Sequence, residues 1–157
     1  MPVSKDEFRA ALGRFASGVT VVTTIGEDNK PAGITVSAFA SVSLDPPFVL
    51  ACVDRRASVH DCLTEGKHFA VNILAEDQEH LSRLFASKDQ DRFSRATYRA
   101  GVTGAPVLEG AAASLECRVV YAYPGGDHTI IVGEVESTSV ADHKPLAYHR
   151  GGYTRLI

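Results

Sequence analysis

The chain has 157 residues, which is enough for one domain with a sizeable hydrophobic core. Apolar residues make up 45% of it and charged residues 22%, a balance typical of a globular protein. The net charge of −3 comes without a basic cluster, which argues against nucleic-acid binding.

Neither a membrane span nor a secretion signal is expected. The longest strongly apolar run, residues 48–53, is far shorter than the roughly 20 residues of a membrane-spanning helix. The first residues lack the apolar segment of a signal peptide, so we expect a cytoplasmic protein. The cysteines (Cys52, Cys62 and Cys117) lack C-x-x-C spacing, which argues against a disulfide framework or a zinc site. Their apolar surroundings indicate small buried residues and not nucleophiles.

The first predicted element is a helix at residues 4–16. Ser4 and Glu7 have the spacing of a capping box, and apolar residues recur behind them with a helical period. The β-branched run at 19–25 then predicts a strand. A polar turn after this run indicates a hairpin with a second strand at 33–44.

The rest of the chain continues this mixture of strands and short helices. In order, we expect a strand at 48–53, a short helix from Ser58 to Gly66, a strand at 68–74, a helix at 76–86, a polar loop at 87–98, and strands at 113–121 and 128–139. This order predicts a mainly β protein, an antiparallel barrel with helices packed outside, formed by residues 1–157 as a single domain.

One stretch, residues 33–47, carries the strongest functional signal. Small hydroxyl residues alternate there with apolar ones, and two prolines end the stretch. Small side chains at every second position let a planar ligand lie close to the strand. They also leave backbone N–H groups and hydroxyls free to bond the edge of that ligand. The pattern therefore indicates a site for a planar ligand.

Several other kinds of site are excluded by their missing motifs. No G-x-G-x-x-G follows a strand, and neither a phosphate-binding G-x-x-x-x-G-K-[ST] loop nor a G-x-S-x-G nucleophile elbow is present. The six histidines show no spacing suited to a metal. No pair of carboxylates is placed for glycosidase chemistry. We therefore expect no metal and assign no catalytic side chain.

Four smaller features each allow two interpretations. Ser58, after Arg55 and Arg56, fits an anion seat at a helix start, or simply a capped helix with solvated arginines. Phe85, with Lys88 and Arg92 behind it, fits a ligand contact or a core residue followed by surface charges.

The other two features lie near the C-terminus. His128 follows two glycines at a strand start, where it would reach a polar cofactor or would merely be exposed. Tyr153 follows two further glycines, and it would face a ligand or seal the core.

The order of these segments resembles a known family. The motifs are F-R-x-A-L-G-x-F-A-x-G-V-T-V-V-T-T, T-x-S-A-F-x-S-V-S-L-x-P-P, F-A-V-N-I-L, L-S-x-x-F-A, L-E-C, G-D-H-T-I-x-V-G-E-V and P-L-x-Y-x-x-G-x-Y. In this order they resemble the short-chain flavin reductases, which have the FMN-binding split-barrel fold, and the resemblance extends over residues 8–156. The resemblance implies a homodimer that reduces FAD or FMN with NADH or NADPH. It also implies a flavin-dependent monooxygenase as the partner that receives the reduced flavin.

The resemblance also implies which residues bind. The flavin contacts would be Thr35, Val36, Ser37, Ala38 and Ser41 around the ring, Cys52 and Val53 behind it, Ala57 and Ser58 at the ribityl phosphate, and Phe85, Lys88 and Arg92 at the remainder. His128 and Tyr153 would meet the nicotinamide nucleotide. The choice between FAD and FMN stays open at this point, as does the choice between NADH and NADPH.

Two other functions fit the same fold. One is a reductase that acts on ferric iron or a corrinoid. The other is a non-catalytic module that binds flavin or haem as a sensor or carrier.

Overall fold

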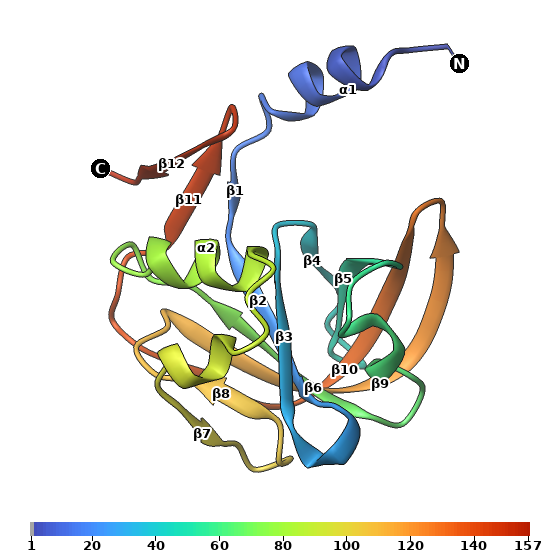
Figure 1. Cartoon of the computed structure of the whole chain (residues 1–157), viewed down its shortest axis with the longest axis vertical. Coiled ribbons are helices and arrows are strands. Elements are labelled where there is room, and N and C mark those ends of the chain that lie inside the picture. Colours follow the sequence, from blue (N-terminus) through green and yellow to red (C-terminus); the bar gives the residue numbers. More distant parts are fainter. Residues whose placement is uncertain (1) are drawn as a thin grey trace.

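The computed structural model describes residues 2–157 and consists mainly of antiparallel strands, as expected (Figure 1). The helices are α1 (Lys5–Leu12) and α2 (Glu79–Ala86), with 3-10 turns η1 (Glu27–Asn29), η2 (His60–Cys62) and η3 (Arg92–Arg95). The strands are β1 (Ser17–Gly18), β2 (Thr20–Ile25), β3 (Pro31–Val36), β4 (Phe39–Ser43), β5 (Phe48–Asp54), β6 (His68–Ile73), β7 (Tyr98–Ala100), β8 (Pro106–Leu108), β9 (Ala113–Gly125), β10 (His128–Val140), β11 (Leu146–His149) and β12 (Gly152–Arg155). No helix within residues 2–157 is long and apolar enough to cross a bilayer.

A seven-stranded sheet in the order β3-β2-β6-β9-β10-β5-β4 forms the body of the protein. Its two edge strands, β3 and β4, follow each other directly in the chain. Contacts between β3 and β5 show that the sheet curls until its ends approach each other. No ladder joins β3 to β4 in the described residues, so the barrel stays open along this seam.

The predicted single strand at 33–44 is wrong, because the chain passes from one edge of the sheet (β3) to the other edge (β4) in the middle of this stretch. Thr20 of β2 still pairs with Val36, whereas the carbonyl of Ala38 already accepts the amide of Cys52 in β5 at 3.0 Å. Ser37 and Ala38 therefore form a corner between the two edges of the sheet. Small and apolar residues alternate without a break through this corner, so periodicity alone does not reveal it.

Helix α1 confirms the predicted capping box. The Ser4 hydroxyl accepts the Glu7 amide at 3.1 Å, and the Glu7 carboxylate accepts the Ser4 amide at 2.8 Å. The helix ends at Leu12, earlier than predicted, and none of its residues is buried. In Figure 1 it stands apart from the sheet. Its apolar side chains thus have no partner within the described chain.

The core consists of two main clusters. One fills the inside of the curved sheet around Phe69 and Ile131. Gly133 makes room for it, because a Cβ there would lie 2.6 Å from the Phe69 ring. The second cluster lies under α2 and includes Phe85 and Leu146. It joins α2 to the C-terminal strands.

Two further predictions about local structure are wrong. The helix expected after Ser58 is only the 3-10 turn η2, which makes no side-chain cap. The loop expected at 87–98 contains η3 and the start of β7. Both segments are too short to show a period in the sequence. Their conformation depends on contacts with the rest of the fold.

Candidate functional site

The candidate site begins where α2 packs on the edge strand β3. The Thr35 hydroxyl donates to the Ser82 carbonyl at 2.6 Å, which ties the helix to the strand. A pocket of about 220 Å³ opens between them. Thr35, Ser37 and Tyr153 all line this pocket, together with Tyr148. The structure thus brings Tyr153 to Thr35 and Ser37, from which it is far apart in the sequence.

The aromatic wall of this pocket comes from the C-terminal hairpin of β11 and β12. Arg150 and Gly151 have φ of 54° and 78°, which makes the turn tight and sets Tyr148 opposite Tyr153. The two rings meet edge to face at 5.2 Å between centroids. The Arg83 guanidinium lies 4.9 Å from the centroid of the Tyr153 ring. The hairpin therefore presents a firmly held aromatic surface.

A second pocket, of about 340 Å³, continues along β3 toward its start. Ser58, Lys88 and Arg92 line it, as do Ala32 and Gly33 of the strand. The structure thus also brings together three predicted flavin contacts from two segments, Ser58 from the one after β5 and Lys88 and Arg92 from the one after α2. Ser58 and Lys88 are exposed and free to meet a phosphate, with Ala57 half-buried beside them.

Arg92 is bonded mainly to the protein itself. Its guanidinium donates to the carbonyls of Gly33 at 2.8 Å and Phe85 at 3.1 Å, and also to those of Ser87 and Asp89. Burial lowers the pKa of Arg92 from its ordinary value. Most of its donors hold the loop after α2 against β3, so its main role is to build a wall of the second pocket.

Phe85 does not contact a ligand in this arrangement. Its side chain is completely buried in the cluster under α2, where it meets the Phe93 ring at 5.0 Å between centroids. A Cβ on Gly33 would lie 3.1 Å from the Phe85 ring, so only glycine lets the ring pack this closely. The predicted flavin contact is thus corrected to a core residue, because the ring has no exposed surface.

Some of the other residues predicted around the ring are buried and others are exposed. Val36 and Val53 are 5% and 1% exposed and belong to the core, so only their backbones can face a ligand. Ala38 and Ser41 are exposed. Cys52 is partly exposed, and burial raises the pKa of its thiol.

His128 lies away from both pockets. It starts β10, pairs in register with Asp54 of β5, and places its Nδ1 2.7 Å from an Asp127 carboxylate oxygen. Hydrogen bonds from Arg56 lower the pKa of the neighbouring Asp54 to about 2. The lining of the pocket that holds Tyr153 does not include His128. The two predicted nicotinamide contacts are therefore not brought together within one chain.

Sequence reasoning missed Ser82, Ala86 and Tyr148, which also line the first pocket. Ser82 is fully buried on the apolar side of α2, next to Leu81. The sequence did contain a signal for Ser82, because a small polar residue on the apolar side of a helix needs a hydrogen-bond partner when it is buried.

Comparison with known proteins decides the family. The model of the "flavin reductase like domain" matches residues 12–156. The chain belongs to the flavin reductase family. This confirms the resemblance found in the sequence.

Relatives of the flavin reductase family match over nearly all of this chain. FMN reductase (NADH) SmoA of Agrobacterium fabrum is 43% identical over 149 residues, which cover 95% of this chain and 84% of the relative. The flavin-dependent monooxygenase reductase subunit HsaB of Mycobacterium tuberculosis is 38% identical, covering 95% of this chain and 81% of the relative.

Other relatives are longer. The reductase component of the flavin-dependent trigonelline monooxygenase of Acinetobacter baylyi is 40% identical over 94% of this chain, which spans only 47% of that relative.

A solved structure has the same fold over the whole chain. The NADH:FAD oxidoreductase SgcE6 of Streptomyces globisporus, in complex with NAD and FAD fragments, superposes with a TM-score of 0.93. It is 39% identical, and the match covers 100% of this chain and 95% of that one. The mainly β, antiparallel architecture is therefore that of a flavin reductase.

Proposed function

We propose that this flavin reductase holds FAD or FMN against the corner at residues 35–38 and reduces it with NADH or NADPH. The chain is an NAD(P)H-dependent oxidoreductase, in keeping with its family and with the activities named for its relatives. Residues 1–157 would form one domain with this activity. The flavin supplies the redox chemistry, since its ring accepts a hydride from the nicotinamide.

The observation that carries the proposal is a pair of free amides at the corner. The backbone N–H groups of Ser37 and Ala38 donate to no acceptor within residues 2–157, and both residues are exposed. Unpaired N–H groups at an exposed edge are natural donors to the polar rim of a flat ring. They can also stabilise negative charge that grows on that ring, as an oxyanion hole does.

The side chains around this corner fit such a ring. Ser37 and Ala38 are small, so a plane can approach the backbone closely. Across the pocket, Tyr153 and Tyr148 supply an aromatic surface, on which Tyr153 would meet the nicotinamide nucleotide, and the buried Val36 supports the strand from behind. The chain orients its ligands and excludes water, and it needs no acid–base side chain.

The other predicted contacts remain part of the proposal. Ala57, Ser58 and Lys88 would receive the ribityl phosphate at the second pocket. His128 would contact the nicotinamide nucleotide from the β9–β10 hairpin, opposite Asp54. The three cysteines are free thiols, which suits the reducing cytoplasm that we propose as the location.

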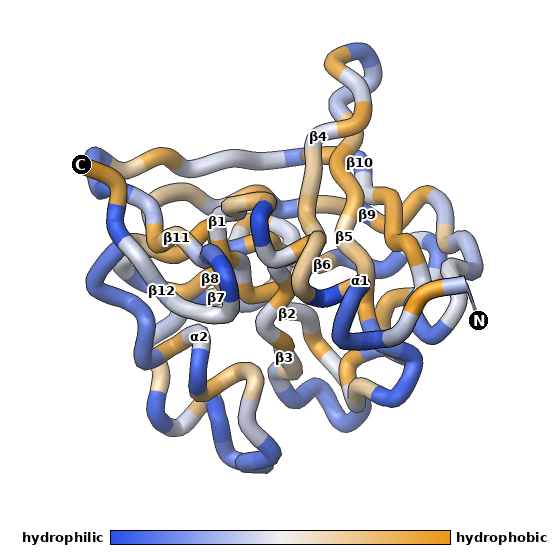
Figure 2. Tube along the Cα trace, turned by 90° about the horizontal axis from the view of Figure 1, so that it is seen from above, coloured by the Kyte–Doolittle hydropathy of each residue, from blue (hydrophilic) through white to orange (hydrophobic). Residues whose placement is uncertain are grey.

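We also propose a homodimer, supported by apolar side chains that the single chain leaves uncovered. Phe8 and Leu12 of α1 are 57% and 54% exposed, and Phe15, which follows the helix, is 80% exposed. Tyr121 and Tyr123 of β9 are 45% and 49% exposed and stack on each other. Figure 2 colours parts of β5 and β9 as hydrophobic, and residues of both strands belong to the buried core. Exposed apolar surface of this extent marks an interface.

Size-exclusion chromatography with light scattering tests the dimer. The wild-type chain should elute as a dimer, and Phe8→Glu with Leu12→Glu should shift it toward monomer. Asp6→Lys, an exposed change on the same helix, should leave the dimer intact. A monomeric wild-type chain would contradict the proposal.

We propose further that the reduced flavin is delivered to a partner monooxygenase. Several relatives are named as reductase components of such two-component systems. The corner is exposed, and backbone groups would make most of the contacts to the ring. Such a site suits a flavin that has to be released after reduction.

The activity is tested by mixing the purified protein with NADH and FAD or FMN in air and following NADH oxidation. Ala38→Trp should abolish turnover, because the bulky ring would fill the place of the flavin. Ser139→Trp, at an exposed position of β10, is the matched control and should remain active. Full turnover by Ala38→Trp would overturn the proposed site.

A further inference from the structure

Two parts of the proposed site lie on segments that meet at one end of the sheet. Ala57 and Ser58, the proposed phosphate contacts, follow β5, and His128, the proposed nicotinamide contact, starts β10. The ladder between β5 and β10 ends where Asp54 pairs with His128. The distance between the two groups of contacts therefore depends on how residues 55–60 are held against β10.

Few backbone hydrogen bonds hold this segment to the β9–β10 hairpin. The Arg55 amide donates to the Asp127 carbonyl at 3.0 Å, just before β10 begins. After that point the chain bonds to itself, since the His60 amide donates to the Ala57 carbonyl at 3.0 Å. Within residues 2–157, no backbone hydrogen bond joins residues 56–60 to β10.

A side-chain hydrogen bond of His60 makes this connection instead. The Nε2 atom of His60 lies 2.7 Å from the hydroxyl oxygen of Thr129, the residue next to His128. The Nδ1 atom lies 2.9 Å from a carboxylate oxygen of Asp61. A carboxylate only accepts hydrogen bonds, so Nδ1 carries a proton and Nε2 of the neutral ring accepts the Thr129 hydroxyl. The imidazole is thus held at both of its nitrogens.

This hydrogen bond lies beside a cavity of about 440 Å³ between the η2 segment and the β9–β10 hairpin. His60 and Thr129 both line the cavity, and both are only partly buried. Val59 and Leu63, on either side of His60 in the chain, are anchored in the core. The segment therefore stays folded without the bond. Because open space adjoins the two residues, packing does not fix their separation, and the hydrogen bond does.

We propose that His60 is a positioning residue of this flavin reductase. Its bond to Thr129 sets the distance between the phosphate contacts at Ala57 and Ser58 and the nicotinamide contact at His128. The inference rests on the proposed function, which assigns these contacts. Hydride transfer needs the reacting atoms about 3–3.5 Å apart, and a misplacement of about 1 Å can lower the rate about 100-fold. The bond therefore acts on the reaction between the two ligands and not on the binding of either one alone.

The test separates these two quantities. Stopped-flow mixing with NADH measures the rate of hydride transfer to bound FAD or FMN, and a fluorescence titration without nicotinamide measures the Kd for flavin. Thr129→Val removes the hydroxyl and keeps the shape of the side chain. It should lower the rate of hydride transfer about tenfold and leave the Kd for flavin within about twofold. Thr129→Ser keeps the hydroxyl and should restore the rate. Thr138→Val, the first of these changes made at an exposed position of the same strand, is the matched control.

A double-mutant cycle tests whether His60 and Thr129 act as one unit. His60→Ala should lower the rate of hydride transfer about as much as Thr129→Val, and the double variant should be no slower than the slower single variant. Effects that multiply in the double variant would show that the two residues act independently, and would overturn the inference.

Two further outcomes would also overturn it. One is an unchanged rate of hydride transfer in Thr129→Val, which would leave the reductase activity standing. The other is a rate that falls together with flavin affinity and melting temperature and that Thr129→Ser does not restore, because this pattern marks a purely structural role. Failure of the wild type to reduce either flavin would instead overturn the proposed function, and the inference with it.

Discussion

The hydroxyl oxygen of Tyr153 lies 2.7 Å from the hydroxyl oxygen of Ser82, and this hydrogen bond joins the C-terminal hairpin to α2. Ser82 is fully buried, so its hydroxyl depends on this partner. The same helix is tied to β3 through the Ser82 carbonyl and Thr35. One residue of α2 thus connects both walls of the first pocket.

Tyr153→Phe should lower the free energy of unfolding by about 1 kcal/mol, because it leaves the buried Ser82 hydroxyl without a partner. The ring would still pack on Tyr148, so the KM for the nicotinamide nucleotide should change little. Urea denaturation and steady-state kinetics measure the two effects. Tyr153→Ala, which also removes the aromatic wall, should raise that KM clearly. Equal kinetics in both variants would show that the ring does not face the ligand.

His128→Ala should raise the KM for NADH or NADPH about fivefold, the effect of losing one hydrogen bond that contributes about 1 kcal/mol. The KM for flavin should stay within about twofold, because His128 lies away from the flavin pockets. His149→Ala, at an exposed position of β11, is the control. A change in the flavin KM without one in the nicotinamide KM would contradict the role given to His128.

Arg92→Lys should destabilise the protein by about 1–3 kcal/mol, although it preserves the charge. A lysine cannot reproduce the fork of a guanidinium that reaches the carbonyls of Gly33, Phe85 and Ser87. The loosened loop should also raise the KM for flavin. Thermal unfolding and flavin titration measure the two effects. Retained stability together with a raised KM would instead indicate that Arg92 acts on the ligand directly.

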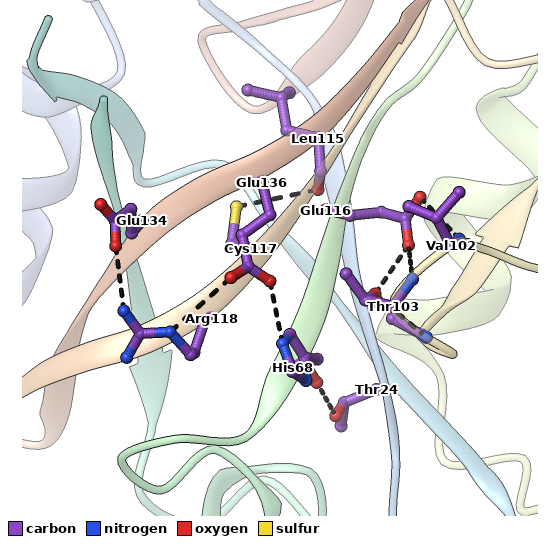
Figure 3. Close-up of polar contacts among 11 residues, drawn as sticks. Thr24, His68, Val102, Thr103, Leu115, Glu116, Cys117, Arg118, Glu134 and Glu136 are labelled. Carbon is purple, nitrogen blue, oxygen red and sulfur yellow. Dashed lines mark hydrogen bonds and ion pairs between the residues drawn. The ribbon is translucent and has the colours of Figure 1, made fainter. Parts of the chain in front are cut away.

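Glu116→Gln should destabilise the protein at neutral pH, and less so in acid. Figure 3 shows the Glu116 carboxylate receiving the amides of Val102 and Thr103 and the Thr103 hydroxyl. Burial raises the pKa of Glu116, but these hydrogen bonds outweigh it and lower the pKa below its ordinary 4.5.

A lowered pKa in the folded state gives stability that is present above pH 4.5 and is lost as the pH falls through the folded-state value. Urea unfolding at several pH values should therefore show a difference between wild type and variant that shrinks in acid. Glu134→Gln, on the more exposed carboxylate that pairs with Arg118 at 2.9 Å, is the control. A difference that is constant down to acid pH would contradict the assignment.

Much of the candidate site could be proposed from sequence because it lies in segments with strong local signals. The small and hydroxyl residues at 35–41 identify the place where a flat ligand can approach the backbone. In the structure, Ser37 and Ala38 lie between two edges of a sheet, which leaves their backbone N–H groups unpaired within residues 2–157. That property depends on how β3 and β4 pair with distant strands, and it leaves no trace in the spacing of residues.

Phe85 and Arg92 show the opposite case. Both belong to a segment whose motif suggests ligand contacts, yet Phe85 is buried and Arg92 is largely bonded to carbonyls. A buried ring and a ligand-facing ring have the same helical spacing, so sequence could not separate them. The packing of α2 against Gly33 decides between the two.

By itself, the sequence determined the strand-rich architecture, the capped first helix and the family, because periodicity, capping and ordered motifs are local properties of a chain. Only the tertiary structure decided the open seam between β3 and β4, the Tyr153–Ser82 bond across 71 positions and the two pockets along β3. These features arise from contacts between segments far apart in the chain, and such contacts form only when the sheet curls and brings its edges together.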